Sequence, residues 1–356
     1  MKGKRSAVFA VLILMILLTA CTKESVDAGI AVEKSSGQIY LYGEMHGNKL
    51  IYEKELELWK DYYDRLGMRH LFVEMPYYTA EFLNLWMKTE DDTILSEVYR
   101  DWEGTAVHTE DTIDFYKSIK EQCPETIFHG TDVGHQYFST GERYLAYLRE
   151  NGMEESEQYI LVEENMKQGK EFYSNADDVY RENALVSNFI REFDALNGAD
   201  IMGIYGADHT NIEKMVYNTS NEPSMAKQLH EYYGKNLYTE DISLLALDIE
   251  PLAYEGIIVN EKEYQAAYFG KQDLSAILPQ YQYREFWLLE NAYEDFKDCT
   301  KTGNVLPYNN YLMKIEVGQI YLVQYTLADG SAQKEIHRAD GNMWQGLEIT
   351  EEIVVE

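Results

Sequence analysis

Four short apolar runs, separated by helical stretches, constrain the fold more than any other feature of this sequence. Each is rich in Ile, Val, Leu, Phe or Tyr and too short for a helix. The runs are QIYLY at 38–42, HLFVE at 70–74, TIFH at 126–129 and DIMGIY at 200–205. Strands that alternate with helical crossovers build a parallel sheet covered on both faces. We therefore expect an α/β core at 38–215, with a mainly parallel sheet flanked by helices.

The periodicity of the chain changes beyond this core. Residues 311–327 alternate between apolar and polar side chains, as in a strand with one buried face. Hairpin turns are expected at Ala328-Asp329-Gly330 and at Asp340-Gly341. We expect a small β-rich C-terminal region at 270–356 and a helical connection at 216–269.

The N-terminal residues predict export and lipid anchoring. Basic residues at 2, 4 and 5 precede an apolar run at 7–18, which is shorter than the roughly 20 residues that span a bilayer. The run ends in Leu18-Thr19-Ala20-Cys21, which resembles the lipobox of bacterial lipoproteins. That resemblance implies a signal peptide at 1–20, acylation of Cys21 with palmitate-like chains, and a tether at 21–37. The expected location is the extracytoplasmic face of the cell membrane, with membrane contact through the anchor only. The alternative is an ordinary signal peptide followed by a buried cysteine.

The net charge limits the classes of binding partner, and the cysteines leave the presence of a disulfide open. The formal net charge of −31 repels nucleic acid and anionic headgroups, so no nucleic-acid partner is expected, and it favours cations such as divalent metals. Two further cysteines, Cys123 and Cys299, could form a disulfide outside the cytoplasm or stay free, and their spacing does not decide between these alternatives.

Polar side chains follow each of the four runs. They are Glu44 and His46 after the first, Glu74 at the end of the second, Asp132 and His135 after the third, and Asp208 and His209 after the fourth. The carboxyl ends of parallel strands meet at one crevice, where ligands bind in open α/β sheets. Two of the segments share the spacing Gly-x-x-His, from Gly43 to His46 and from Gly206 to His209. Glycine at a strand end allows a sharp turn and a close approach to a ligand.

These motifs resemble a known superfamily. GEMHG at 43–47, VEMP at 73–76, RENALVSN at 181–188 and GADH at 206–209 occur in the order seen in the superfamily of TIKI/TraB-type proteins, ChaN-like haem-binding lipoproteins and erythromycin esterases. The resemblance covers about 38–215 and implies a parallel α/β core. By position, His46 and His209 match its paired histidines, Glu74 its strand-end glutamate, and Arg181 its helix arginine.

The superfamily implies two chemistries. In TIKI-type proteins the motifs support metal-dependent peptide cleavage, whereas in erythromycin-esterase-type proteins a histidine is proposed to activate water without a required metal. Esterase-type sequences usually place one more residue between the motif glutamate and histidine than Glu44-Met45-His46 does, so this spacing fits TIKI- and ChaN-like members better. Leu185 stands where a methionine is common.

The candidate residues suit hydrolysis with or without a metal. His46, Glu74 and His209 could ligate Mn, Co or Zn and leave one position open for water. Without metal, a histidine paired with a carboxylate could act as a general base. We assign Glu44 as a proton shuttle and Arg181 to stabilising an oxyanion or a substrate carboxylate.

Three functions are compatible with these residues. The first is a hydrolase of ester, lactone or peptide bonds acting on a small molecule or peptide. The second is a ChaN-like lipoprotein that binds haem or another small ligand, for which Asp132 and His135 are candidate cofactor-binding residues. The third is an interaction protein with a degenerate site. The sequence has no Gly-x-Ser-x-Gly elbow, P-loop or dinucleotide fingerprint, which excludes serine hydrolases, nucleotide hydrolases and dehydrogenases.

Overall fold

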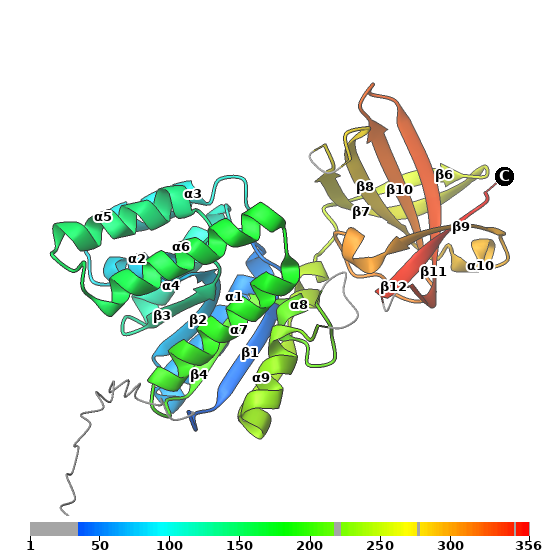
Figure 1. Cartoon of the computed structure of the whole chain (residues 1–356). Helices are drawn as coiled ribbons and strands as arrows, with labels where there is room; N and C mark the ends of the chain where they lie inside the picture. Colours follow the sequence, from blue (N-terminus) through cyan, green and yellow to red (C-terminus); the bar gives the residue numbers. More distant parts are fainter. Residues whose placement is uncertain (1–34, 217–221, 276–277, 345–346, 356) are drawn as a thin grey trace, which may run out of the picture. The chain divides into compact units, whose positions relative to one another are not determined.

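A computed structural model of the chain (Figure 1) describes residues 35–216, 222–275, 278–344 and 347–355. The predicted signal peptide, Cys21 and most of the predicted tether lie outside these residues. Within the described ranges, no helix combines the length and the apolar character that a membrane crossing requires.

The core of the α/β part is a parallel sheet of five strands in the order β3-β2-β4-β1-β5. The strands are β1 Ile39–Glu44, β2 His70–Pro76, β3 Ile127–Asp132, β4 Ile201–Gly206 and β5 Leu237–Asp241. The four expected runs form the first four strands. The predicted fold class, a mainly parallel sheet with flanking helices and a β-rich C-terminal region, is confirmed.

Helices connect the strands and cover both faces of this sheet (Figure 1). They are α1 Lys49–Asp61, α2 Tyr77–Trp86, α3 Thr93–Asp101, α4 Glu110–Gln122, α5 Glu142–Glu150, α6 Glu157–Asn175, α7 Asp178–Ala195, α8 Ala207–Thr210 and α9 Met225–Tyr233. Short π-helices, η1 Tyr62–Leu66 and η2 Tyr137–Gly141, and 3₁₀ helices, η3 Gly234–Asn236 and η4 Ser243–Leu247, accompany them. Polar caps begin several of them. The side chain of Asn48 accepts the backbone N–H groups of Leu50 and Ile51 at the start of α1, and Asp177 accepts that of Tyr180 at the start of α7.

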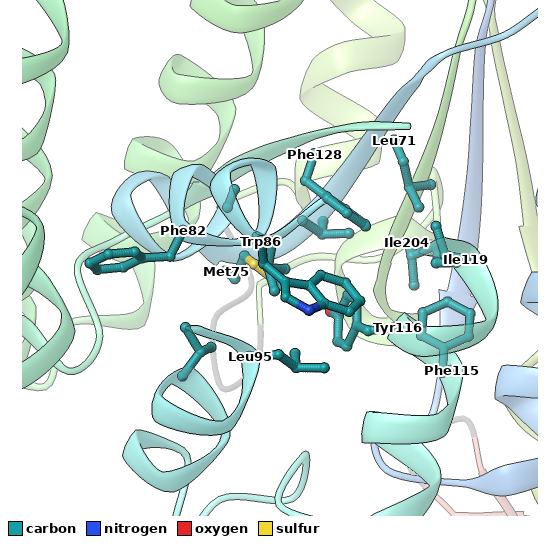
Figure 2. Packing of buried hydrophobic residues seen from close by; sticks show 14 of the residues in the cluster. Leu71, Met75, Phe82, Trp86, Leu95, Phe115, Tyr116, Ile119, Phe128 and Ile204 are labelled. Atoms are coloured by element: carbon teal, nitrogen blue, oxygen red, sulfur yellow. The ribbon is translucent and has the colours of Figure 1, made fainter. Parts of the chain in front are cut away.

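The two faces of the sheet have separate cores. Successive side chains of a strand point to opposite faces, so Leu71 and Val73 of β2 pack with residues of α1 to α6, whereas Phe72 packs with residues of α7 and α9. Figure 2 shows the first core, in which the fully buried Trp86 of α2 lies near Leu95.

The expectation of a helical connection at 216–269 is wrong in its secondary structure. The described part of this segment contains α9, but it also contains β5, β6 (Ala253–Val259) and most of β7 (Lys262–Asp273). Among the strands that the structure describes, β5 pairs with β1 alone. It is largely exposed, and its sequence LYTED accordingly carries no apolar run.

The C-terminal region is an antiparallel sheet with the strand order β6-β7-β8-β10-β11-β12-β9. Its remaining elements are β8 Tyr281–Leu289, α10 Tyr293–Phe296, β9 Lys301–Pro307, η5 Tyr308–Asn310, β10 Ile320–Leu327, β11 Ala332–Trp344 and β12 Leu347–Ile353. The sheet begins at residue 253 rather than at 270. The turn at 328–330 joins β10 to β11 as expected. Asp340-Gly341, however, lies inside β11 at a register shift, where the φ of +73° at Gly341 forms a bulge instead of a turn.

Both described cysteines are free thiols. Cys123 is completely buried in the core of the α/β part, and burial raises the pKa of its thiol to about 11. Cys299 is partly buried against the core of the antiparallel sheet. Cys123 and Cys299 are therefore not joined by a disulfide in this structure.

Candidate functional site

Four strand ends bring the predicted polar residues to the carboxyl edge of the parallel sheet. Glu44 is the last residue of β1 and is level with Gly206, the last residue of β4. Asp132 ends β3 opposite Pro76, two residues beyond Glu74. Helix α8 begins directly after β4 and carries His209.

Glu74 is the centre of this group. Its Oε1 accepts a hydrogen bond of 2.6 Å from Arg181 and lies 3.4 Å from His209 Nε2. Its Oε2 accepts a hydrogen bond of 2.6 Å from the backbone N–H of Gly206 and lies 3.7 Å from His46 Nε2. The side chain is 7% exposed. One buried carboxylate therefore lies between the two motif histidines.

Each histidine is also held by a second carboxylate on its other nitrogen. His46 Nδ1 is 2.6 Å from Glu44 Oε1, and His209 Nδ1 is 2.6 Å from Glu182 Oε2. A carboxylate at Nδ1 keeps a proton on that nitrogen and fixes the orientation of the ring. The site thus contains two equivalent histidine–carboxylate pairs, and both Nε2 atoms face Glu74.

Glu182 was missed by the sequence reasoning. Its side chain is 3% exposed, and its Oε1 accepts the backbone N–H of Met225 at the start of α9. It lies on the buried face of α7 together with Leu185 and Phe189. An acidic residue within the apolar stripe of a helix was the signal that could have identified it.

Arg181 links Glu74 to a second cluster. Its Nε donates a hydrogen bond of 3.0 Å to Asp132 Oδ1, and its Nη2 donates one of 2.5 Å to Asp132 Oδ2. The same Nη2 also donates to Glu74. Asp132 Oδ2 lies 2.9 Å from His135 Nε2, and His135 Nδ1 lies 2.6 Å from the hydroxyl of Tyr173. The guanidinium therefore bridges two carboxylates. In this arrangement it positions Glu74, and it could reach an oxyanion only by weakening one of these ion pairs.

Mutual charges outweigh burial in setting the ionisation of the site. Burial favours the neutral acid of Glu74, but the charges of His209 and His46 hold its pKa well below the usual range. Burial likewise disfavours charged imidazoles. Glu74 and the partner carboxylates nevertheless raise the pKa of His209 to about 10 and that of His46 well above its ordinary value. The resting site therefore holds protonated imidazoles around an ionised Glu74, and its histidines are ready to donate protons.

Close packing favours glycine at both Gly-x-x-His motifs, strongly at Gly43 and less strongly at Gly206. A Cβ on Gly43 would lie 2.3 Å from Thr210 Oγ1 and 3.0 Å from Ala207 Cα. A Cβ on Gly206 would lie 3.3 Å from both Glu74 Oε2 and His46 Nε2. The spacing from glycine to histidine thus has a physical basis at both strand ends.

Two hollows that share Arg181 border the histidines. A hollow of about 240 Å³ is lined by His46, Glu74, Asp132, His135, Tyr173 and Arg181, among others. Another, of about 200 Å³, is lined by His209, Arg181 and Glu182, among others. Both are smaller than the roughly 300–1,000 Å³ of typical small-ligand pockets.

The predicted metal ligands fit a divalent ion poorly in this arrangement. Among the side chains that the structure describes, no group of three or more His, Cys, Asp or Glu is placed to hold a metal ion. Both oxygens of Glu74 already accept hydrogen bonds, from Arg181 and from Gly206, and the guanidinium would repel a second cation there. A site for Mn, Co or Zn at His46, Glu74 and His209 stays a prediction.

Comparisons with known proteins give similarities of fold at low identity. No protein-family model and no curated protein match the sequence. A protein from Bacillus cereus is 13% identical, with 71% of this chain and 76% of that chain covered and a TM-score of 0.42. A mutant of the erythromycin esterase EreC in its open conformation is 9% identical, with 72% and 83% covered and a TM-score of 0.44. A succinoglycan biosynthesis protein is 14% identical, with 57% and 65% covered and a TM-score of 0.41.

Proposed function

We propose that this protein is a hydrolase that cleaves an ester, lactone or peptide bond of a small molecule or peptide. We further propose that it acts at the extracytoplasmic face of the cell membrane, anchored through acylated Cys21. One observation carries the hydrolase proposal: two imidazoles, each with its own carboxylate at Nδ1, direct their Nε2 atoms to the shared carboxylate Glu74.

The two histidine–carboxylate pairs can divide acid and base roles between them. One imidazole first loses its Nε2 proton to solvent, and it then takes a proton from water as the water oxygen attacks the carbonyl carbon. The other, protonated, donates from Nε2 to the leaving alkoxide or amine, so that each proton has a donor and an acceptor. General acid–base catalysis of this kind contributes about 10²–10⁴-fold. Glu44 and Glu182 stabilise the imidazolium charges, and Glu74 fixes the distance between the two rings.

The second candidate is a binding lipoprotein for haem or another small ligand. It is favoured by the chain of polar contacts from Asp132 through His135 to Tyr173 along the 240 Å³ hollow. Both nitrogens of His135 are engaged in these contacts, so ligation of haem iron by this residue would first have to break one of them.

A hydrolysis screen on the purified protein tests the proposal. With a responsive ester, lactone or peptide, His46→Ala and His209→Ala are each expected to lower kcat/KM by about 10²-fold or more, because each removes one proton-transfer group. His230→Ala is the matched control, since His230 is exposed on α9. Circular dichroism checks that the variants fold.

Three results would redirect the conclusion. Unchanged turnover in both site variants contradicts the mechanism. Turnover that is lost with chelator and restored by Mn²⁺, Co²⁺ or Zn²⁺ would favour metal-dependent hydrolysis over the metal-free mechanism. A Soret band that appears on haem titration and is lost in His135→Ala favours the binding lipoprotein.

A further inference from the structure

A small cavity beside His46 contains carboxyl oxygens without partners. The cavity has a volume of about 60 Å³, and Glu44, Glu55 and Glu74 contribute its acidic lining. Glu55, on α1, is 0% exposed. Within the described part of the chain, neither of its carboxyl oxygens has a hydrogen-bond partner, and Glu44 Oε2 has none either. Three oxygens of two buried carboxyl groups are therefore unsatisfied at one place.

This arrangement is costly for the fold. Glu55 shares the buried face of α1 with Ile51, Tyr52 and Trp59, where an apolar side chain would pack without loss. A buried carboxylate without a counter-charge costs several kcal/mol. Burial, followed by the charge of Glu44 and its close contact with Glu55, raises the pKa of Glu55 well above its usual range, although the charge of His46 acts in the opposite direction. In the absence of a further cation, Glu55 therefore favours its protonated form.

Aromatic rings form much of the remaining wall. Tyr52, Trp102, Phe115 and Tyr116 all line the cavity. The ring centroids are 4.8 Å apart for Tyr52 and Phe115, 5.4 Å for Phe115 and Tyr116, and 5.9 Å for Trp102 and Tyr116, so the rings form a continuous series. Figure 2 shows Phe115 and Tyr116 near Ile204, which also lines the cavity. Aromatic faces attract organic cations.

We propose that this cavity binds the ammonium group of an amine-bearing substrate, with Glu44 and Glu55 as its counter-charges and the aromatic rings as its walls. The inference rests on the proposed hydrolase and names its substrate class. His46 and Glu74 line both this cavity and the 240 Å³ hollow. An ammonium group held here leaves the rest of the substrate beside the candidate catalytic residues.

The size and chemistry of the cavity favour an organic cation over a metal ion. Because a water needs about 10–15 Å³ by this measure, the cavity has room for roughly four to six water-sized atoms, enough for a short alkylammonium group. Calcium requires six to eight oxygen ligands. The two acidic residues offer three free oxygens, and the hydroxyl of Tyr52 is already bonded to Thr112 at 2.9 Å.

Calorimetric titration of the whole protein tests this inference. Ethylammonium chloride is the probe, sodium chloride at equal ionic strength controls for salt, and ethanol is the neutral analogue of similar size. We expect saturable binding of ethylammonium alone. Glu55→Gln should weaken it at least 10-fold, whereas Glu53→Gln, an exposed position on the same helix, should leave it unchanged. Trp102→Leu, which removes an aromatic wall but no charge, should also weaken it, and circular dichroism verifies that each variant is folded.

The outcomes separate the inference from the proposed function. Absence of ethylammonium binding, equal binding of ethanol, or saturable binding of sodium ions in its place overturns the ammonium site. If neutral esters are cleaved while ethylammonium does not bind, the hydrolase proposal survives alone. If ethylammonium binds but no ester, lactone or peptide is cleaved, the cavity is a cation site and the hydrolase proposal fails.

Discussion

Glu55 links the stability of the fold to pH. Its pKa in the folded protein is raised well above the value of 4.5 that an unburied glutamate has. The stability it contributes is therefore fully present below pH 4.5 and is lost as the pH rises toward the folded pKa, because the unfolded chain ionises first. Over that window the loss is up to about 1.4 kcal/mol per pH unit.

Glu55→Gln should remove this loss, because glutamine has a similar shape and cannot ionise. We expect the variant to exceed the wild type in free energy of unfolding by at least about 1 kcal/mol at pH 8, and by much less at pH 5. Urea unfolding at both pH values measures the difference, with Glu53→Gln as the exposed control. The same difference at both pH values would show that ionisation of Glu55 is not its source.

At the level of residues, the sequence is informative where polar groups follow a strand. Glu44, His46, Glu74 and His209 could be selected because a strand end on a parallel sheet has a predictable position. Glu55 and Glu182 were not selected, because an acidic residue in a helix usually faces solvent, although each falls within the apolar stripe of its helix. Their burial depends on tertiary packing. Arg181 was selected by resemblance, and only the coordinates show that it bridges Glu74 and Asp132.

At the level of elements, the end of β4 sets the geometry of the site. Gly206 donates its N–H to Glu74 and has a φ of −50°, which alanine also adopts. A methyl group there would lie 3.3 Å from both Glu74 Oε2 and His46 Nε2, so these side chains would have to shift.

Gly206→Ala is therefore expected to fold normally and to lose activity. The melting temperature should change by only a few degrees, whereas kcat/KM should fall by about 10- to 100-fold, because small displacements of catalytic groups are costly. Steady-state kinetics and a thermal melt on the same preparation make the comparison. Full activity in a folded variant would show that Glu74 and His46 tolerate displacement.

Strand prediction succeeded where burial produced a continuous apolar run. The central strands β1, β2 and β4 carry such runs, and β3 carries a shorter one at the opposite edge. Edge strand β5 has a single partner and mixed polarity, so no periodicity revealed it. The bulge at Gly341 was taken for a turn because Asp-Gly favours positive φ in both structures.

At the level of the whole molecule, the candidate site residues are confined to one part of the sequence. Every candidate catalytic, metal or cofactor residue lies between Glu44 and His209, within the parallel α/β part. The described residues of the antiparallel sheet contribute none of them. Under the proposed function, the strand-end loops and the cavity beside His46 are the candidates for substrate recognition. The net charge of −31 agrees with a cationic rather than an anionic substrate group.

The predicted lipid anchor at Cys21 would hold the intact chain at the membrane. Two or three acyl chains hold a protein at a membrane far more firmly than one, so an acylated Cys21 should keep the protein in the membrane fraction. Cys21→Ser should abolish labelling by radioactive palmitate in a bacterial host and shift the protein out of that fraction. Cys123→Ser and Cys299→Ser are the matched controls, since both residues are free thiols far from the lipobox in sequence, and each variant should retain the label. Labelling that persists in Cys21→Ser would place the acyl group elsewhere, and the anchoring proposal would fail while the residues of the hydrolytic site stay untouched.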